Sequence, residues 1–345
     1  MRVQGRVDVP ASCTGFNDEA YRRGWTDGLP VMPPTTKLIQ EFVAASGLPP
    51  DHLVAEVESR RGLATVEVIA ANAVMAGCLP AHMPVVVAAV RAICRPEFNL
   101  SALQTTTNPV GVMLVVNGTV RDRVEMNSGR DLLGPASRAN ATIGRAVRLV
   151  QRNCGGAIPG EIDKATHGWP GKYTFCFAEA EEESPWAPLS VDQGYAPGED
   201  VVTVVAAQGT NNVGPGLSVP HTVLRVIANG LASYGNNNFL LGGGNPAVIL
   251  PPGHAKRFQN AGWSKKDVKE FVFEHSAVDV DRMVPIEELF HDARFNLSNG
   301  KAYCCADPDD LLIIVAGAPE PYHVTCVPNF GDSRCVSEPV GQQAA

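Results

Sequence analysis

The feature that most constrains the fold is an alternation of short apolar runs with longer helix-like segments. Runs rich in Val, Ile and Leu are typical of buried strands, because β-branched side chains suit a pleated surface. The predicted strands are 110–116, 172–180, 201–207, 247–250 and 311–316. The predicted helices are 37–46, 65–76, 84–93, 141–152, 220–233 and 264–274. This alternation predicts an α/β architecture with largely parallel sheets.

A short internal similarity suggests two related lobes. The segment Asn-Pro-Val-Gly-Val-Met-Leu at 108–114 resembles Asn-Pro-Ala-Val-Ile-Leu at 245–250, and each follows a helix and a polar loop. An internal duplication would give two α/β lobes with a site between them. We therefore divide the chain into an N-terminal arm and helix (1–62), a first lobe (63–195) and a second lobe (196–345). The arm at 24–35 has too many Pro and Gly residues for a helix or central strand, so we expect it to be extended.

Composition and charge limit the partners. The chain has 45% hydrophobic and 19% charged residues, as is typical of a globular protein. Its formal net charge of -8 disfavours nucleic acid and anionic membranes as partners, because both attract basic surfaces. It shows neither the apolar stretch of a signal peptide nor a run of the ~20 apolar residues that span a bilayer. We expect a cytoplasmic protein that acts on a small molecule and forms a homo-oligomer.

Four loops dense in Asn, Gly and Thr flank the apolar runs, at 104–109, 137–145, 208–214 and 236–246. Gly, Asn and Pro also dominate ordinary turns, but several such loops at strand ends favour a pocket for a small polar or anionic ligand. The predicted substrate-binding residues are Asn108, Asn140, Thr142, Arg145, Lys172, Asn211 and Asn245. Arg145 and Lys172 are the cations among them and suit a carboxylate or phosphate, although an exposed helix arginine is the simpler interpretation of Arg145.

Cys78 is the candidate nucleophile. The nine cysteines form no C-x-x-C motif, so neither a redox dithiol nor a zinc knuckle is encoded locally. Cys78 lies between two predicted helices, with Pro80 and Pro84 after it, and a helix N-terminus there would stabilise its thiolate. The alternative is a small buried side chain at a helix elbow, which is the usual role of a free cysteine.

Three histidines and one aspartate are the other chemical candidates. His82, His221 and His254 each follow a Pro at a predicted helix start, where a neutral imidazole could act as a base or bind a divalent metal. Their spacing matches no local metal motif, and helix caps or surface positions are the alternative. Asp27, in the arm, is a candidate general acid/base, or else forms an Asx-turn.

Parts of the chain resemble a known family. The run Gly-Trp-Thr-Asp-Gly-Leu-Pro-Val at 24–31, with the segments 72–78, 139–145 and 184–186, resembles the motifs of a large, mostly uncharacterised bacterial family. Its members are sometimes labelled thioredoxin-like, but this chain lacks the C-x-x-C motif on which that chemistry depends. The resemblance therefore implies a family and almost no function.

Together these residues predict an enzyme that cleaves a bond in a small polar or anionic organic substrate, as a lyase or hydrolase. Cys78 or a metal-activated water would be the reactive centre, Asp27 and His254 would carry protons, and Arg145 would anchor the substrate. The alternative is a non-catalytic ligand-binding or scaffold subunit of an enzyme complex. A nucleotide cofactor is disfavoured, because the glycines at 242–244 do not form the G-x-G-x-x-G motif.

Overall fold

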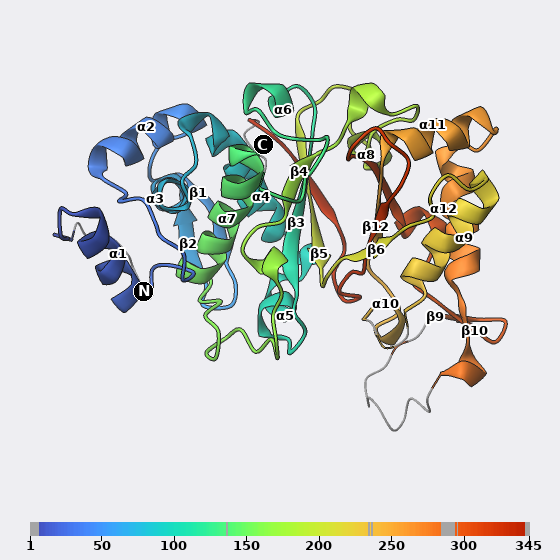
Figure 1. The fold of residues 1–345 in the computed structure, drawn as a ribbon. Coiled ribbons are helices and arrows are strands. Elements are labelled where there is room, and N and C mark those ends of the chain that lie inside the picture. Colours follow the sequence, from blue (N-terminus) through green and yellow to red (C-terminus); the bar gives the residue numbers. More distant parts are fainter. Residues whose placement is uncertain are drawn as a thin grey trace.

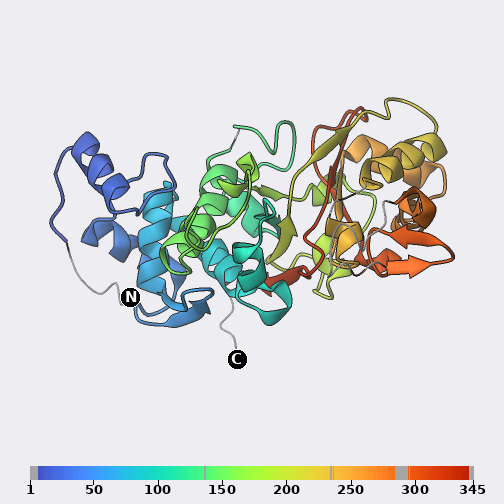
Figure 2. The same ribbon diagram turned by 90° about the horizontal axis from the view of Figure 1, so that it is seen from below.

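Two four-stranded sheets lie face to face, and helices cover the outer face of each sheet (Figures 1 and 2). The computed structural model describes residues 7–135, 137–233, 235, 237–283, 294 and 296–341. Across this part of the chain the layers follow the order helix, sheet, sheet, helix. The α/β class predicted from the sequence is confirmed at this level.

The first lobe consists of one sheet with its helices and a separate hairpin. Its helices are α1 (Cys13–Arg22), α2 (Thr36–Ser46), α3 (Val66–Ala76), α4 (Met83–Ile93), α5 (Leu100–Thr105), α6 (Val120–Arg123) and α7 (Arg138–Asn153), with 3-10 turns η1 (Pro80–His82), η2 (Pro96–Phe98) and η3 (Pro170–Lys172). The sheet has the order β13 (Val336–Pro339), β5 (Val201–Ala207), β3 (Gly111–Asn117) and β4 (Cys176–Ala178). The hairpin pairs β1 (Leu53–Val57) with β2 (Gly62–Thr65).

The second lobe likewise consists of a main four-stranded sheet, its helices and a small separate sheet. Its helices are α9 (Pro220–Leu231), α10 (Asn237–Leu240), α11 (Pro252–Asn260) and α12 (Lys265–Ser276), with turns η5 (Val280–Arg282) and η7 (Pro308–Asp310). The turn η4 (Glu181–Glu183) and the short helix α8 (Leu189–Asp192) follow β4, and α8 contacts both β5 and β11. Its main sheet has the order β11 (Leu312–Val315), β7 (Ala247–Leu250), β12 (Val324–Val327) and β6 (Asn211–Val213). A small sheet joins β8 (Val278–Asp279), β10 (Lys301–Tyr303) and β9 (Asn296–Ser298).

Local capping signals define several helix ends where the sequence predicted them. The Thr35 hydroxyl accepts a hydrogen bond from the Leu38 N–H at the start of α2, and Thr65 caps α3 in the same way. Both helices end at a glycine in the left-handed region, Gly47 with φ 71° and Gly77 with φ 88°. The segment 24–35 forms neither helix nor strand, as predicted for the arm.

The two main sheets are mixed, so the prediction of largely parallel sheets is wrong. One inner strand of each sheet has neighbours in both directions. β3 is parallel to β4 and antiparallel to β5, and β7 is parallel to β11 and antiparallel to β12. Burial of both faces explains the error, because every residue of β3 and β5 is buried whatever the strand direction.

The outer strands cross between the lobes. β6 follows β5 in the chain but pairs with β12 in the second sheet, and β13 follows β12 but pairs with β5 in the first sheet. The predicted division at residues 195/196 therefore does not follow the sheets, since β5 and β13 belong to the first. This exchange links the two lobes through backbone hydrogen bonds.

The space between the sheets is filled with apolar side chains. Met113 and Val115 of β3 pack in one cluster with Ile249 of β7 and Ile314 of β11, whereas Leu114 faces the helices of the first lobe. Burial of one such side chain contributes about 1.5–3 kcal/mol to stability. As far as the structure describes it, the middle of this interface is packed core and leaves no room for the site that the sequence suggested between the lobes.

Candidate functional site

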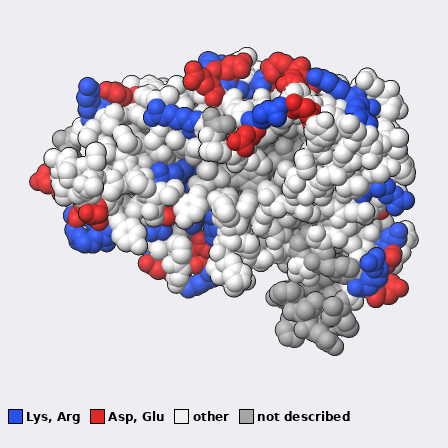
Figure 3. All heavy atoms as spheres, viewed as in Figure 1, with Lys and Arg blue, Asp and Glu red and all other residues white. Residues whose placement is uncertain are grey.

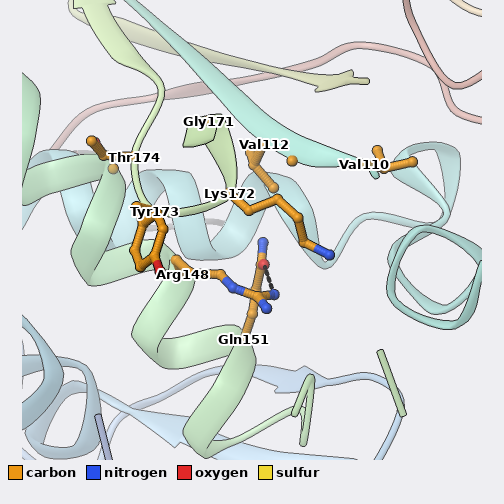
Figure 4. A pocket seen from close by; sticks show the side chains of 10 residues that line it. Val110, Val112, Arg148, Gln151, Gly171, Lys172, Tyr173 and Thr174 are labelled. Carbon is orange, nitrogen blue, oxygen red and sulfur yellow. Dashed lines mark hydrogen bonds between the residues drawn. The ribbon is translucent and has the colours of Figure 1, made fainter. Parts of the chain in front are cut away.

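A small polar pocket lies where β3 begins, between α7 and the η3 turn (Figure 4). Its empty volume is about 250 Å³, part of it open to solvent. The residues that line it are Val110, Gly111, Val112, Gly144, Arg148, Gln151, Gly171, Lys172, Tyr173 and Thr174. We call it the Arg148–Lys172 pocket. Of the predicted ligand-binding residues only Lys172 lines it, in the η3 turn and not in the strand predicted there.

One carboxylate holds the two cations of the pocket. Oδ2 of Asp163 lies 3.0 Å from Nη2 of Arg148 and 2.7 Å from Nζ of Lys172. Burial lowers the pKa of Lys172, and the charge of Arg148 adds to this, while the hydrogen bond to Asp163 opposes it. Burial raises the pKa of Asp163, but the contacts with Lys172 and with the Ala165 N–H outweigh it, so the pKa is below its ordinary value. The carboxylate is thus ionised at neutral pH.

Two buried donors at the pocket have no hydrogen-bond partner among the described residues. They are Nε2 of Gln151, whose side chain is almost fully buried, and Nε1 of Trp169. In Figure 4 Gln151 turns its amide oxygen to Arg148 (3.4 Å from Nη1) and its nitrogen away, toward the strand of Val112. The Trp169 nitrogen lies beside pocket-lining Gly111, 3.3 Å from where a Cβ there would be. Unpartnered buried donors are rare in folded proteins, where an ordered water or a bound ligand usually supplies the acceptor.

Glycines make room for this arrangement. A Cβ on Gly144 would lie 2.4 Å from the Thr174 hydroxyl, and a Cβ on Gly171 would lie 2.2 Å from the Trp169 ring. Only a glycine at position 144 lets the chain before β4 lie directly on α7. The pocket wall therefore depends on these two residues, which the sequence analysis did not single out.

Arg145 and Asp27, predicted as anchor and proton carrier, bind each other. Nε and Nη2 of Arg145 each lie 2.8 Å from an oxygen of Asp27, and Nη2 also donates to the Pro30 carbonyl. Burial raises the pKa of Asp27, but the hydrogen bonds and charge of Arg145 outweigh it, and the pKa falls below its ordinary value. The pair ties the arm to α7, and neither side chain lines the pocket.

Cys78 lies at the elbow between α3 and η1, in contact with α7. It is buried, and its thiol donates to the Thr142 carbonyl at 3.3 Å. Burial raises the pKa of the Cys78 thiol to about 12, despite that hydrogen bond and the charges of Arg138 and Arg145. The thiolate expected from a helix N-terminus is therefore absent at neutral pH, because desolvation outweighs the helix end. The Thr142 hydroxyl lies 3.4 Å from Nδ1 of His82.

The three histidines do not meet. His82 belongs to the helical layer of the first lobe, whereas His221 and His254 belong to that of the second, with both sheets between them. Over the described ranges, no group of three or more His, Cys, Asp or Glu side chains is placed to hold a metal ion. The three-histidine metal site is therefore wrong.

Burial keeps two of these histidines neutral, as the sequence analysis expected. Burial and a nearby arginine lower the pKa of His82 to about 4, and the same causes act on His254 with the same result. His254 is fully buried beside Phe258, and neither of its ring nitrogens has a partner among the described residues. His221 is exposed, with its ring against Phe271.

Three of the four polar loops meet at one end of the sandwich and bind one another. Nδ2 of Asn237 donates to Oδ1 of Asn108 at 2.5 Å and to Oε1 of Gln208 at 2.9 Å. Nε2 of Gln208 in turn donates to the Asn329 carbonyl at 3.1 Å. We call Asn108, Gln208, Asn237, Asn245 and Asn329 the amide cluster.

Asn329 is the centre of the amide cluster and is fully buried. Its Oδ1 accepts the N–H of Asn245 at 3.1 Å, and its Nδ2 donates to the Ala206 carbonyl at 3.1 Å. Asn245 donates to the Asp310 carbonyl and accepts the Cys335 N–H. The cluster therefore joins backbone segments of both sheets, and the sequence analysis missed Asn329 because it stands alone after β12.

The fourth loop and the remaining predicted residues act locally. Oδ1 of Asn140 accepts the Asn127 N–H at 3.0 Å, and its Nδ2 donates to the carbonyls of Asn127 and Leu132. Asn211 lies exposed on the edge strand β6 and donates to the Gly230 carbonyl. These contacts fix loops and leave the pocket to other residues.

The pocket residues that sequence reasoning missed are Arg148, Gln151 and Asp163. Gly144, Arg148 and Gln151 stand four and three residues apart, so they share one face of α7. That spacing was readable, because the sequence places two polar side chains and a glycine on one helical face. Asp163 lies in a loop between η3 and α7, where no periodic pattern marks it.

The charged surface shows no concentration of one sign on the face that Figure 3 presents. Acidic and basic side chains are interleaved along its upper rim, and the middle is largely uncharged. Many of the chain's charges form ion pairs, such as Arg121 with Glu182 at 2.6 Å. None of the helices in the described ranges is both long and apolar enough to cross a bilayer.

Comparison with known proteins adds no identity. No family model matches the chain, and no curated protein matches it.

Proposed function

We propose that the chain is an enzyme that binds a small organic anion in the Arg148–Lys172 pocket and cleaves a bond in it, as a lyase or hydrolase. One observation supports this most strongly. Gln151, whose buried amide nitrogen has no partner among the described residues, lines a pocket together with two cations that share a single carboxylate, and the similarly unpartnered Trp169 nitrogen lies next to pocket-lining Gly111. A ligand that satisfies such a site has to bring acceptor atoms and negative charge.

Lys172 is the proton carrier in this proposal. Its ammonium group is at the pocket, and burial together with the charge of Arg148 lowers the pKa of the amine. An amine whose pKa moves toward the working pH exchanges protons more readily with a substrate. Lys172 replaces Asp27 and His254 in this role, because Lys172 lines the pocket and neither Asp27 nor His254 does.

The second candidate is ligand binding without turnover, as in a subunit of an enzyme complex. The observation that favours it is the placement of the predicted reactive groups. Asp27 is held by Arg145, and the buried Cys78 thiol is protonated. The same pocket would then act as a sensor or carrier site for the anion.

The test is calorimetric titration of the full-length protein with acetate, with Lys172→Met as the variant. Lys164→Met is the matched control, because Lys164 lies in the same region but is exposed and outside the pocket. Loss of the ion contact should weaken acetate binding about tenfold or more in Lys172→Met and leave Lys164→Met unchanged. Absence of acetate binding by the wild-type protein would refute the proposal.

Turnover is tested separately by incubating the protein with a panel of small carboxylic acids and following their NMR signals. Consumption of one acid that Lys172→Met slows supports the enzyme. Acetate binding with every acid intact supports the non-catalytic subunit.

We also infer that the two sheets arose by duplication, and that copies of the chain associate. The duplication is supported by the shared pairing of β3 and β7, each preceded by Asn-Pro, with a later parallel and a later antiparallel partner. Association is supported by Leu53 and Leu63, two half-exposed leucines on the β1–β2 hairpin. Light scattering of the purified protein measures the oligomeric state.

A further inference from the structure

The charge of the Arg148–Lys172 pocket can be counted from its contacts. Arg148 and Lys172 contribute two positive charges, and the shared carboxylate of Asp163 removes one. The nearest other pair, Arg145 with Asp27, is neutral as a unit. The pocket thus holds one uncompensated positive charge.

Arg152 adds little to this count. It follows Arg148 by one turn of α7 and donates to the Gly24 carbonyl of the arm, so it faces away from the pocket. Its side chain is partly exposed, and water and salt screen its charge. The remaining pocket donors, on Gln151 and Trp169, are neutral.

A monocarboxylate matches this combination. Its single charge is balanced by the net charge of the pocket, and its oxygens bring an acceptor to the wall that contains Gln151, whose amide nitrogen has no partner among the described residues. A dianion brings a second charge with no counter-charge, and burying an uncompensated charge is costly. Val110 and Val112 form an apolar wall beside these charges, against which a short hydrocarbon remainder can lie.

We propose that the Arg148–Lys172 pocket selects singly charged organic anions, above all short monocarboxylates, over dianions. This inference rests on the proposed function and adds the charge class of its ligand. Asp163 sets that class, because its carboxylate reduces the two cations to a net charge of one.

The experiment compares three probes by calorimetry on the full-length protein: acetate, methanesulfonate and sulfate. Methanesulfonate and sulfate are tetrahedral oxyanions of similar size that carry one and two negative charges. Because a methyl group also replaces one oxygen, the shift of their ratio in the charge variant below separates the effect of charge from that of the methyl group. The wild-type protein should bind methanesulfonate at least about tenfold more tightly than sulfate, since the second charge of sulfate loses its hydration in the pocket without a counter-charge to replace it.

Asp163→Asn raises the net charge of the pocket by one while keeping the shape of the side chain. The preference should then shift toward sulfate by about tenfold or more. If the wild-type protein binds sulfate as tightly as methanesulfonate or more tightly, the proposed preference for singly charged anions is wrong. The proposal that the pocket binds anions would still stand. If none of the three probes binds, the proposed function fails as well. The wild-type ratio decides the inference even if Asp163→Asn does not fold.

Discussion

The amide cluster and the Arg148–Lys172 pocket are both polar regions at the margins of the sandwich. They differ in whether their buried polar groups are hydrogen-bonded within the protein. In the amide cluster, Asn237 binds two neighbouring side chains and Asn329 binds two backbone groups. At the pocket, the donors on Gln151 and on neighbouring Trp169 have no acceptor among the residues that the structure describes. The polar groups of the amide cluster bind one another and the backbone, whereas the donors at the pocket are left for a ligand or water to pair.

This difference shows why the density of polar residues alone does not locate a site. The loops richest in Asn and Gly suggested a ligand, yet most of their amides hold backbone segments together. A buried amide that is fully hydrogen-bonded stabilises the fold, whereas an unpaired one costs free energy until a ligand arrives. An unmatched donor that also lines a pocket, as Gln151 does, is therefore a more specific sign of binding than a polar loop.

The largest effect is expected at the centre of the amide cluster. Asn329→Ala leaves the Asn245 N–H and the Ala206 carbonyl buried without their partner, which should lower the free energy of unfolding by about 2–4 kcal/mol. Urea denaturation measures this change. Acetate affinity of the folded variant should be unchanged, and a loss of affinity would mean that the two regions are coupled.

A matched pair of substitutions tests the comparison directly. Gln151→Leu removes an unpaired donor and one long contact from Arg148 to the amide oxygen (3.4 Å), so it should change the free energy of unfolding by less than about 1 kcal/mol and weaken acetate binding about tenfold. Gln208→Leu makes the same change in the amide cluster, and it should cost about 1–2 kcal/mol of stability and leave acetate binding intact. Urea denaturation measures the stability of both variants, and calorimetry measures their affinity for acetate. The same pattern in the two variants would contradict the distinction.

The smallest effect concerns Asp27 and Arg145, a pair that also satisfies itself. Because the pKa of Asp27 is lowered in the folded protein, its contribution to stability is complete above the ordinary value of 3.8 and is lost as the pH falls through the folded value. Asp27→Asn should therefore be about 1 kcal/mol less stable than the wild type at neutral pH, and this difference should shrink in acid. Urea denaturation of both proteins at neutral pH and at a pH below 3.8 measures this difference in stability. A difference that grows in acid would rule out the ion pair as its source.

The sequence alone determined what depends on neighbouring residues. The capping threonines and terminal glycines predicted α2 and α3 almost to the residue, because a cap needs only a few adjacent groups. The apolar runs predicted buried strands at β3, β5, β7 and β11, and the prolines predicted the extended arm. Neutral His82 and His254 also followed, although burial accounts for them and the helix ends alone do not.

Only the tertiary structure decided strand direction, the exchange of β6 and β13, and which polar groups meet. An apolar run indicates burial of both faces and carries no information about the direction of its neighbour. Asp163 approaches Arg148 and Lys172 through the path of a loop, and Asp27 reaches Arg145 across more than a hundred residues of chain. Such long-range contacts determine whether a polar side chain is hydrogen-bonded within the protein or remains available to a ligand, and no local sequence pattern predicts them.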